Sequence, residues 1–264
     1  MKFVRFVSAE YPEGTYGVFA GSGHIEVISG SLFDQVQKTV KLVEESEITR
    51  YLPPVNPPNI LAIGLNYIEH SKETKQKLPT EPLMFIKANT TVIGHGDNIV
   101  LPHVAPNGVD YEAELCVIIG KTARNVSEDD ALSYVFGYTC GNDVSDRDVQ
   151  FSDGQWARGK SFDTFAPLGP YIETDYDTSS RRVISRLNGE VMQDGITSDM
   201  VFPVPKLVSY LSHCMTLLPG TVIMTGTPSG VGYTRTPPVY LKSGDISEIE
   251  VEGLGILRNK IVAE

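Results

Sequence analysis

Short apolar runs rich in β-branched residues, each closed by Gly, Pro or Asn, most constrain what this chain can fold into. They recur after residue 60, as in ILAIG (60–64), ELCVIIG (114–120), GTVIMTGT (220–227) and DISEIEVEGLGILRNKIV (245–262). Apolar runs of this kind, separated by turn residues, are typical of β-strands. The sequence therefore predicts a mainly β body.

Three segments predict helices instead. Residues 31–45 (SLFDQVQKTVKLVEE) repeat apolar side chains at helical spacing behind a serine that can cap the helix. Residues 127–137 also start at a serine cap, and residues 205–215 start at a proline, which helices accept in their first turn. We expect the first of these helices to belong to a small N-terminal α+β unit.

A proline-rich segment separates this unit from the rest of the chain. Residues 52–59 (LPPVNPPN) hold four prolines in eight positions, so they can form neither a regular helix nor a central strand. We interpret the segment as a linker. The predicted domains are a small α+β domain at 1–55 and a larger, mainly β domain at 56–264, and the fold class is α+β.

The charge balance excludes several classes of partner. The 264 residues carry a formal net charge of −11, so there is no basic surplus to neutralise the phosphates of nucleic acid or of an anionic membrane. No apolar run reaches membrane-spanning length, and the first residues alternate like a strand rather than forming a signal peptide. We expect a cytoplasmic protein that binds neither nucleic acid nor membrane.

Acidic residues lie unexpectedly at the start of the apolar run in GVDYEAELCVIIGK (108–121). Side chains of a strand alternate between faces, so Glu112 and Glu114 share a face with Cys116 and Ile118. Two carboxylates beside core residues repel each other and lose hydration unless a cation lies between them. Taken alone, the stretch predicts either a solvated strand end or a metal site.

A third acid, Asp143, follows another apolar run and begins the acidic part of GNDVSDRDVQ (141–150). Together with Glu112 and Glu114 it would form a set of oxygen ligands suited to Mg²⁺, Mn²⁺ or Ca²⁺. In the same segment Arg147 and Gln150 are three residues apart, which places them on one face if the stretch is helical, where they can hold a carboxylate. The alternative is an exposed turn of mixed charge.

Five motifs occur in the order found in the fumarylacetoacetate hydrolase family, which this chain resembles over roughly residues 60–257. They are AIGLNYIEHSKE (62–73), YEAELCVIIG (111–120), GNDVSDRDVQ (141–150), ARGKSFDTFAPLGP (157–170) and MTGTPSGVG (224–232). The resemblance implies a mixed β-sandwich roll as the catalytic domain. It also implies that Glu112, Glu114 and Asp143 bind Mg²⁺ or a similar ion. Asp110 precedes the family's motif and is left out of the predicted site.

The resemblance extends to the residues that act on substrate. It implies that Arg147, Gln150 and Lys160 hold the carboxylate and keto oxygens of the substrate or support the metal, with Lys160 also stabilising an enolate. It implies that Thr227 donates a hydrogen bond from the glycine-rich turn at 224–232, although such turns are usually only turns.

His70 occupies the position of the family's water-activating histidine, and Glu73 is its acidic partner. On one helical turn the two can face each other, and a carboxylate beside an imidazole raises its basicity and fixes its tautomer. The polar residues that follow, at 71–82, are expected either to close over the site as a lid or to form a solvated loop.

The expected reaction is metal-dependent hydrolysis of a carbon–carbon bond in a β-diketo acid, such as an acylpyruvate, fumarylpyruvate or fumarylacetoacetate-like compound. Its products would be a keto acid and a carboxylic acid. The alternative is an oxaloacetate decarboxylase or a 2-hydroxymuconate-type isomerase, since the same enolate-stabilising site serves each reaction. A non-catalytic metal-binding or small-acid-binding protein is a third hypothesis. The resemblance also suggests a homodimer.

Overall fold

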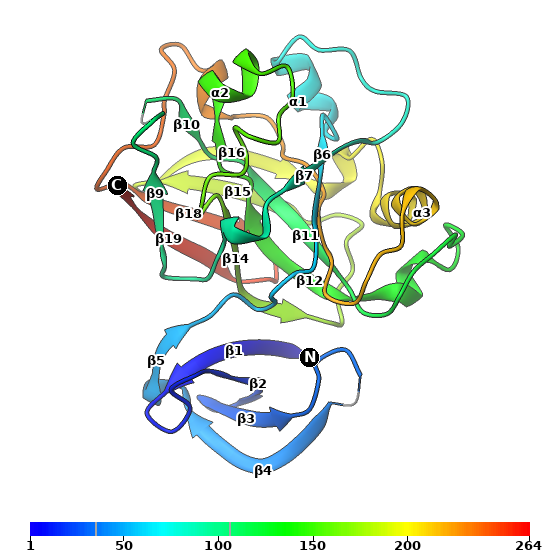
Figure 1. The fold of residues 1–264 in the computed structure, drawn as a ribbon, viewed down its shortest axis with the longest axis vertical. Helices are drawn as coiled ribbons and strands as arrows, with labels where there is room; N and C mark the ends of the chain where they lie inside the picture. Colours follow the sequence, from blue (N-terminus) through cyan, green and yellow to red (C-terminus); the bar gives the residue numbers. More distant parts are fainter. Residues whose placement is uncertain (35, 106) are drawn as a thin grey trace.

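The protein, described by a computed structural model for residues 1–34, 36–105 and 107–264, is built mainly from strands (Figure 1), as predicted. One large twelve-stranded sheet runs through the molecule, and ten of its strands form a continuous path. In spatial order these are β4 (Gln37–Glu44), β3 (His24–Ser29), β2 (Thr15–Gly21), β1 (Lys2–Ser8), β14 (Ala166–Glu173), β12 (Val135–Asn142), β11 (Ala113–Ile119), β17 (Val222–Met224), β6 (Ile60–Gly64) and β7 (Leu83–Lys87). The other two are β5 (Ile48–Tyr51), paired with β1, and β8 (Val92–Ile93), paired with β14.

A second, five-stranded sheet and a short ribbon complete the β structure. The five-stranded sheet has the order β16 (Glu190–Ile196), β15 (Arg182–Leu187), β18 (Ile246–Val251), β19 (Ile256–Ala263) and β9 (Asn98–Leu101), and the ribbon pairs β10 (Val109–Asp110) with β13 (Ser145–Asp146). The α-helices are α1 (Ile68–Glu73), α2 (Arg147–Ser152) and α3 (Val204–Cys214). The 3-10 turns are η1 (Glu45–Glu47), η2 (Asn89–Thr91), η3 (Ala131–Tyr134), η4 (Thr197–Asp199) and η5 (Gly232–Thr234).

Strand β11 lies at the centre and is buried on both faces. Leu115, Val117 and Ile119 pack into the core shared with α3 and the five-stranded sheet. Cys116 and Ile118 point the other way, into a second core that includes residues of the N-terminal strands. A strand covered on both faces needs a continuous apolar sequence, which explains why ELCVII shows no polar alternation.

The helix predicted at residues 31–45 is wrong. Residues 37–44 form β4 instead, paired antiparallel with β3 at the edge of the sheet, and only the turn η1 follows. Thr39, Val40 and Val43 are β-branched, which disfavours a helix and suits a strand. Residue 35, inside the predicted helix, lies outside the described residues. The N-terminal unit is therefore built from strands β1–β5.

The helix predicted at 205–215 is confirmed as α3, but the helix at 127–137 is wrong beyond one turn. Its middle forms η3, and from Val135 onward the chain enters β12. Pairing of β12 with both β11 and β14 outweighs the local helical spacing.

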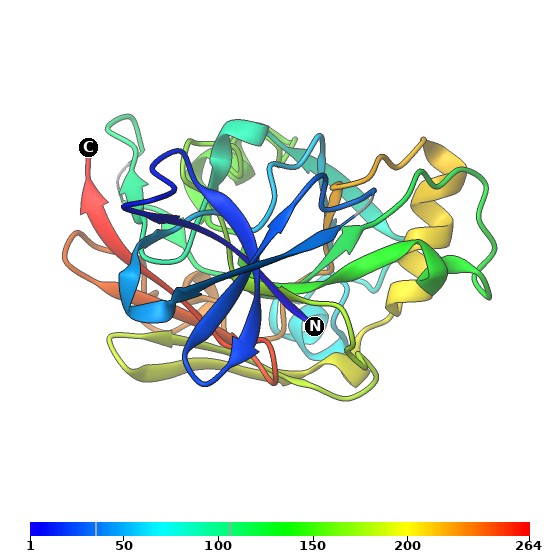
Figure 2. The ribbon, with the colours of Figure 1, turned by 90° about the horizontal axis from the view of Figure 1, so that it is seen from below.

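The proline-rich segment lies between β5 and β6, as a linker would. The large sheet nevertheless continues across the predicted boundary, because β1 pairs with β14 at Phe3 and Ile172. Figure 2 shows the N-terminal strands crossing beneath the body of the molecule. The division at residue 55 stays a prediction. Within the described ranges, no helix is both long enough and apolar enough to cross a membrane.

Strand pairing gathers the predicted motifs at one edge of the large sheet. The antiparallel register joins Ala113 to Asn142, so the residues flanking this pair, Glu112 and Asp143, are brought together. Strand β17 pairs with β11 and with β6, which brings its glycine-rich turn and the segment leading to α1 to the same edge. Four strand ends therefore surround a single site.

Asn66 joins three of these segments. The residue is fully buried, and its Nδ2 donates to the carbonyls of Phe202 (3.0 Å) and Thr225 (2.7 Å), while its Oδ1 accepts from the Phe202 N–H at 2.8 Å. The amide thus holds the chain before α1 against both the strand end after β17 and the approach to α3.

We predict that Asn66→Ala lowers the free energy of unfolding by about 3 kcal/mol. The substitution leaves buried backbone groups without hydrogen-bond partners, and each such group costs about 1–3 kcal/mol. Urea denaturation monitored by circular dichroism measures the change. Gln37→Ala, at an exposed position of β4, is the control and should change stability by less than about 0.5 kcal/mol. Equal stability of the two variants would show that the Asn66 amide does not hold these segments together.

Candidate active site

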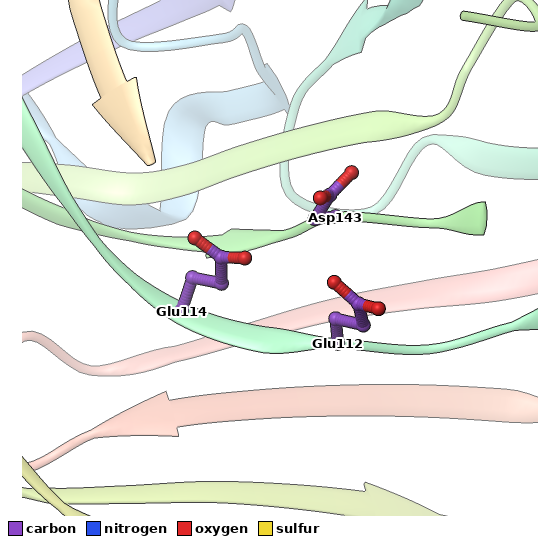
Figure 3. A group of neighbouring side chains, drawn as sticks. All are labelled: Glu112, Glu114 and Asp143. Carbon is purple, nitrogen blue, oxygen red and sulfur yellow. The ribbon is translucent and has the colours of Figure 1, made fainter. Parts of the chain in front are cut away.

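Three carboxylates meet at the start of β11. Glu112, Glu114 and Asp143 each offer an oxygen, and these atoms lie within 4.8 Å of one another (Figure 3). All three side chains are buried, with at most 6% of any residue exposed. The solvated strand end, one of the two interpretations of this stretch, is therefore excluded.

Buried cations lie on one side of this group. The Lys160 Nζ donates to Asp143 Oδ2 at 2.6 Å and to Glu112 Oε2 at 2.9 Å. Lys87, fully buried at the end of β7, contacts Asp143 and donates to the Val144 carbonyl at 3.1 Å. No lysine or arginine in the described ranges forms an ion pair with Glu114.

The unequal pairing separates the pKa values of the two glutamates. Burial alone would raise the pKa of Glu112, but Lys160 and Arg147 outweigh burial and hold it well below its ordinary range. Burial, together with repulsion from Asp143 and Glu112, raises the pKa of Glu114 well above its ordinary range. Of the three carboxylates, Glu114 is the one that has no ion-pair partner within the part of the chain that the structure describes.

This imbalance fits a divalent metal ion. Three carboxylates make an all-oxygen donor set, which suits Mg²⁺, Mn²⁺ or Ca²⁺ better than zinc. One oxygen of Glu114, Oε2, accepts from the Gly226 N–H at 2.7 Å, which orients the carboxylate. The surrounding cluster has four acids and three bases, a formal net charge of −1 when all of them are ionised: Asp110, Glu112, Glu114 and Asp143 against Lys87, Arg147 and Lys160.

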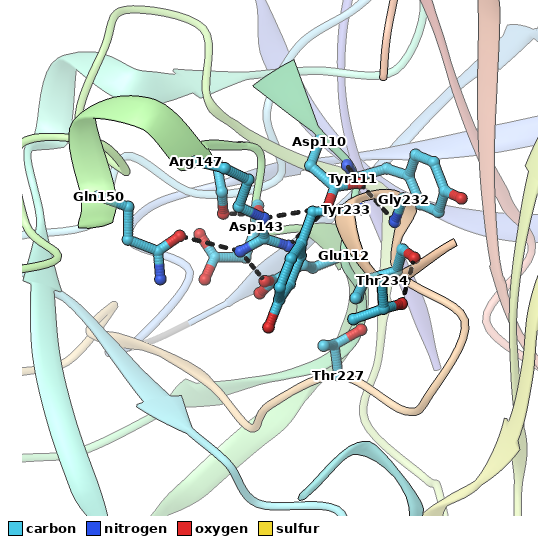
Figure 4. Close-up of polar contacts among 12 residues, drawn as sticks. Asp110, Tyr111, Glu112, Asp143, Arg147, Gln150, Thr227, Gly232, Tyr233 and Thr234 are labelled. Atoms are coloured by element: carbon cyan, nitrogen blue, oxygen red, sulfur yellow. Dashed lines mark hydrogen bonds and ion pairs between the residues drawn. The ribbon is translucent and has the colours of Figure 1, made fainter. Parts of the chain in front are cut away.

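Arg147 and Gln150 lie on one face of α2, as predicted. The Arg147 Nη1 donates to Gln150 Oε1 at 2.9 Å and also pairs with Glu112 Oε1 at 2.7 Å (Figure 4). Asp146 caps the helix by accepting from the Val149 N–H at 2.8 Å. The guanidinium therefore serves the protein's own carboxylate, and the role of this pair in holding a substrate stays a prediction.

Asp110, left out of the predicted site, is the second carboxylate on Arg147. It is fully buried, and its Oδ2 accepts from the Arg147 Nε at 2.9 Å. It also accepts backbone N–H groups from Tyr111 (2.8 Å), Gly232 (2.8 Å) and Tyr233 (3.0 Å). Asp110 thus fixes the arginine and the turn η5 together, although it lies beyond reach of the three-acid group.

His70 and Glu73 face each other on α1, as predicted, with 3.1 Å between Nδ1 and Oε2. The other oxygen of Glu73 accepts from the Gly230 N–H (2.9 Å) and the Thr234 hydroxyl (2.8 Å). Burial alone would raise the pKa of Glu73, but these hydrogen bonds outweigh burial and hold it below its ordinary value. The hydrogen bond from His70 contributes the most. An ionised Glu73 favours a hydrogen on Nδ1, which leaves Nε2 free to accept a proton.

A cavity of about 210 Å³ joins the two groups of residues. Six of the predicted site residues line it, namely His70, Glu112, Arg147, Gln150, Lys160 and Thr227. The Thr227 hydroxyl already donates to the Ala113 carbonyl at 3.0 Å and accepts from the Gln193 amide at 2.7 Å, so the expected donation to substrate is not available in this arrangement. Gln76, from the polar segment at 71–82, also lines the cavity, and closure of that segment stays a prediction.

The sequence interpretation missed Lys87, Asp110, Tyr233 and Trp156. Lys87 could have been found from the sequence, because it is a lone lysine at the end of the apolar run LMFIK, and an apolar strand rarely carries a charge that has no partner. Tyr233 stacks on Arg147, with 4.6 Å from the guanidinium carbon to the ring centroid, and lies in a turn where no pattern marks it.

Comparison with known proteins identifies the family. The family model described as fumarylacetoacetate (FAA) hydrolase C-terminal matches residues 59–262. This chain belongs to the fumarylacetoacetate hydrolase family. An uncharacterized protein of Archaeoglobus fulgidus is 52% identical over 213 residues, which cover 81% of this chain and 82% of that protein.

Two further relatives carry the names of enzymes. The mitochondrial oxaloacetate tautomerase FAHD2A of Homo sapiens is 42% identical over 84% of this chain and 72% of its own length. The crystal structure of 5-carboxymethyl-2-hydroxymuconate delta-isomerase from Mycobacterium smegmatis superimposes with a TM-score of 0.90 over both complete chains, at 37% identity. The fold class and the family membership are thus established, and the chain is an enzyme of this family.

We predict that Asp110→Asn lowers the free energy of unfolding by about 3–5 kcal/mol, because it leaves the buried Arg147 without its full charge partner. Denaturant unfolding measures the loss. Asp194→Asn removes the same charge from an exposed pair with Arg182 and should cost less than about 1 kcal/mol. A loss at Asp110 no larger than the loss at Asp194 would show that Asp110 does not support the arginine.

We predict that Glu114→Gln weakens binding of Mn²⁺ by at least about 100-fold, because a first ligand should matter more than the 10–100-fold that supporting residues contribute. Isothermal titration calorimetry of the metal-stripped protein measures the affinity. Glu190→Gln, at the exposed first residue of β16, keeps wild-type affinity if the site is the one assigned. Unaltered Mn²⁺ affinity in Glu114→Gln would exclude Glu114 as a ligand.

Proposed function

We propose that this enzyme catalyses metal-dependent keto–enol tautomerisation of a small 2-oxo acid of the oxaloacetate type. The observation that carries the proposal is the carboxylate-paired imidazole of His70 and the ammonium group of Lys160, which line one small cavity. Tautomerisation needs a base that moves a proton at carbon and an electrophilic site that stabilises the enolate oxygen.

The size of the cavity favours a compact substrate. Its volume of about 210 Å³ equals the share of about seven water molecules at ~30 Å³ each. Pockets for drug-sized ligands start at about 300 Å³, so a keto acid of four or five carbons, such as oxaloacetate or acetylpyruvate, fits better than a longer diketo acid such as fumarylpyruvate. The human relative named as an oxaloacetate tautomerase agrees with a small substrate of this kind.

Glu112, Glu114 and Asp143 would hold the metal ion. When bound, a divalent ion supplies Lewis-acid stabilisation of negative charge on the substrate's keto oxygen and carboxylate. With all seven side chains ionised, the ion would bring the formal net charge of the cluster from −1 to +1, which favours an anionic substrate.

The side chains divide the remaining work. His70, with Nδ1 directed at Glu73, takes the proton from C3 of the substrate through Nε2 and releases it to solvent, while the enolate oxygen at C2 takes up a proton from solvent to complete the enol; the reverse direction follows the same steps backward. Lys160, which lines the cavity beside Glu112 and Asp143, places a fixed positive charge near the oxygen at C2. Burial lowers the pKa of Lys160, but Asp143 and Glu112 outweigh burial and raise it, so this group stays charged at neutral pH.

Hydrolysis of a β-diketo acid is the second candidate. The same His70–Glu73 pair can take a proton from water, so that the oxygen of water adds to the distal carbonyl of the diketo acid. The carbon–carbon bond then breaks to give a carboxylic acid and an enolate, and this enolate would need the same electrophilic site. A fumarylacetoacetate hydrolase from Exiguobacterium antarcticum has a TM-score of 0.86 to this chain at 36% identity. The shared fold therefore supports both reactions as candidates, and an assay of both kinds of substrate separates them.

We predict that His70→Asn lowers kcat/KM for the enol form of oxaloacetate by about 10²–10⁴-fold, the range that general acid–base catalysis contributes. Loss of the enol's ultraviolet absorbance, with Mg²⁺ present, follows the reaction. His103→Asn, at an exposed position, is the control and should retain wild-type activity. Full activity in His70→Asn would remove the histidine from the mechanism.

A substrate panel separates the two reactions. Oxaloacetate, acetylpyruvate and fumarylpyruvate are assayed side by side with Mg²⁺ and with a chelator. The proposal expects chelator-sensitive tautomerisation of oxaloacetate with little cleavage of the two diketo acids. Preferential release of pyruvate and a carboxylic acid from acetylpyruvate or fumarylpyruvate would favour the hydrolase.

A further inference from the structure

Aromatic rings form part of the wall of the cavity beside the charged residues. Trp156 and Phe85 both line it, with ring centroids 5.6 Å apart and ring planes at 74°. The Lys160 Nζ lies 5.0 Å from the centroid of the Phe85 ring. The aromatic wall, defined by Trp156 and Phe85, therefore begins directly beside the group that faces the substrate's keto oxygen.

Trp156 is seated against backbone that has no side chain. A Cβ atom added to Gly64, the last residue of β6, would lie 2.2 Å from a carbon of the indole ring. Real Cβ atoms do not approach other atoms this closely, so glycine at position 64 makes room for the indole. The indole is thus in close contact with the backbone of β6 and forms this side of the cavity wall.

The turn that carries Trp156 is fixed as well. The Lys160 N–H donates to the Trp156 carbonyl at 3.2 Å. Gly159 packs so closely against α2 that an added Cβ would lie only 2.6 Å from the backbone nitrogen of Gln150. The Asp146 N–H donates to the Gly159 carbonyl at 2.8 Å. These contacts attach the turn to α2, so the indole keeps its place relative to Gln150 and Lys160.

From this geometry we infer that Trp156, seated on Gly64, limits the size of the substituent that a 2-oxo acid can carry at C3. The inference rests on the proposed function, because it takes the acid–base cluster as the place where the 2-oxo acid binds. Compact groups such as hydrogen or carboxylate fit into the space in front of the indole, whereas an aryl group would collide with the ring. Trp156 is thus a specificity-determining residue.

The test compares the enol forms of oxaloacetate and phenylpyruvate in wild type, Trp156→Phe and Trp156→Ala. The wild type should prefer oxaloacetate. Trp156→Ala should shift the ratio of the two kcat/KM values toward phenylpyruvate by at least about 10-fold, the lower end of what one methylene group contributes in a fitted pocket. The ratio for Trp156→Phe should lie between the ratios for wild type and Trp156→Ala. If Trp156→Ala fails to fold, the comparison of wild type with Trp156→Phe provides the test. Equal losses for both substrates would overturn the inference.

A remote aromatic residue supplies the control. Phe19 on β2 packs against Tyr171 with centroids 5.8 Å apart and does not line the cavity, so Phe19→Ala should leave the ratio unchanged. A shifted ratio in Phe19→Ala would show that general loosening, rather than the indole, sets the preference.

Binding without turnover separates the two proposals. Calorimetry with Mg²⁺ compares the affinities of pyruvate and phenylpyruvate for wild type and Trp156→Ala. A shift in relative affinity with no tautomerisation of either enol would keep the size limit and reject the proposed function. Tautomerisation of oxaloacetate with an unchanged affinity ratio would reject the size limit alone. Because Trp156 is the only tryptophan of the chain, quenching of wild-type emission by pyruvate gives an independent report of binding beside the ring.

Discussion

The mutual repulsion of buried carboxylates at the start of β11 is the constraint on which the site depends. Glu112, Glu114 and Asp143 are brought together by the register of β11 and β12, in a buried place where they have little contact with water. Lys160 and Lys87 offset part of the charge, and they come from distant points of the chain. The glutamate without such a partner, Glu114, accounts for the fit to a divalent ion.

A single turn connects this charged cluster to the acid–base pair on α1. Backbone N–H groups of η5 and its neighbours donate to Asp110, which holds Arg147, while Gly230 and Thr234 donate to Glu73. The segment 230–234 therefore positions two carboxylates at the same time: Glu73, which pairs with the His70 imidazole, and Asp110, which pairs with Arg147. In this arrangement the residue that moves the proton and the residues that hold the charge share one rigid support.

Much of the site could be predicted from the sequence, because its residues lie in motifs whose local spacing carries the information. The alternation of Glu112 with Glu114 predicted a shared face. Contacts made by tertiary register were not predictable in this way: Lys87 reaches Asp143 from another strand, and Asp110 holds a turn more than a hundred residues away. Strand β4 was mistaken for a helix because its apolar residues also fit a helical repeat, and pairing with β3 decided the outcome.

The central claim is that the site moves a proton at C3 of a compact 2-oxo acid without breaking a carbon–carbon bond. Proton NMR of oxaloacetate in D₂O, with enzyme and Mg²⁺, tests it most directly. The account predicts that the C3 signal is lost to deuterium faster than without enzyme, while the carbon skeleton stays intact and a chelator abolishes the acceleration. Enzyme-dependent formation of pyruvate at the rate of signal loss, or exchange no faster than in its absence, would contradict the claim.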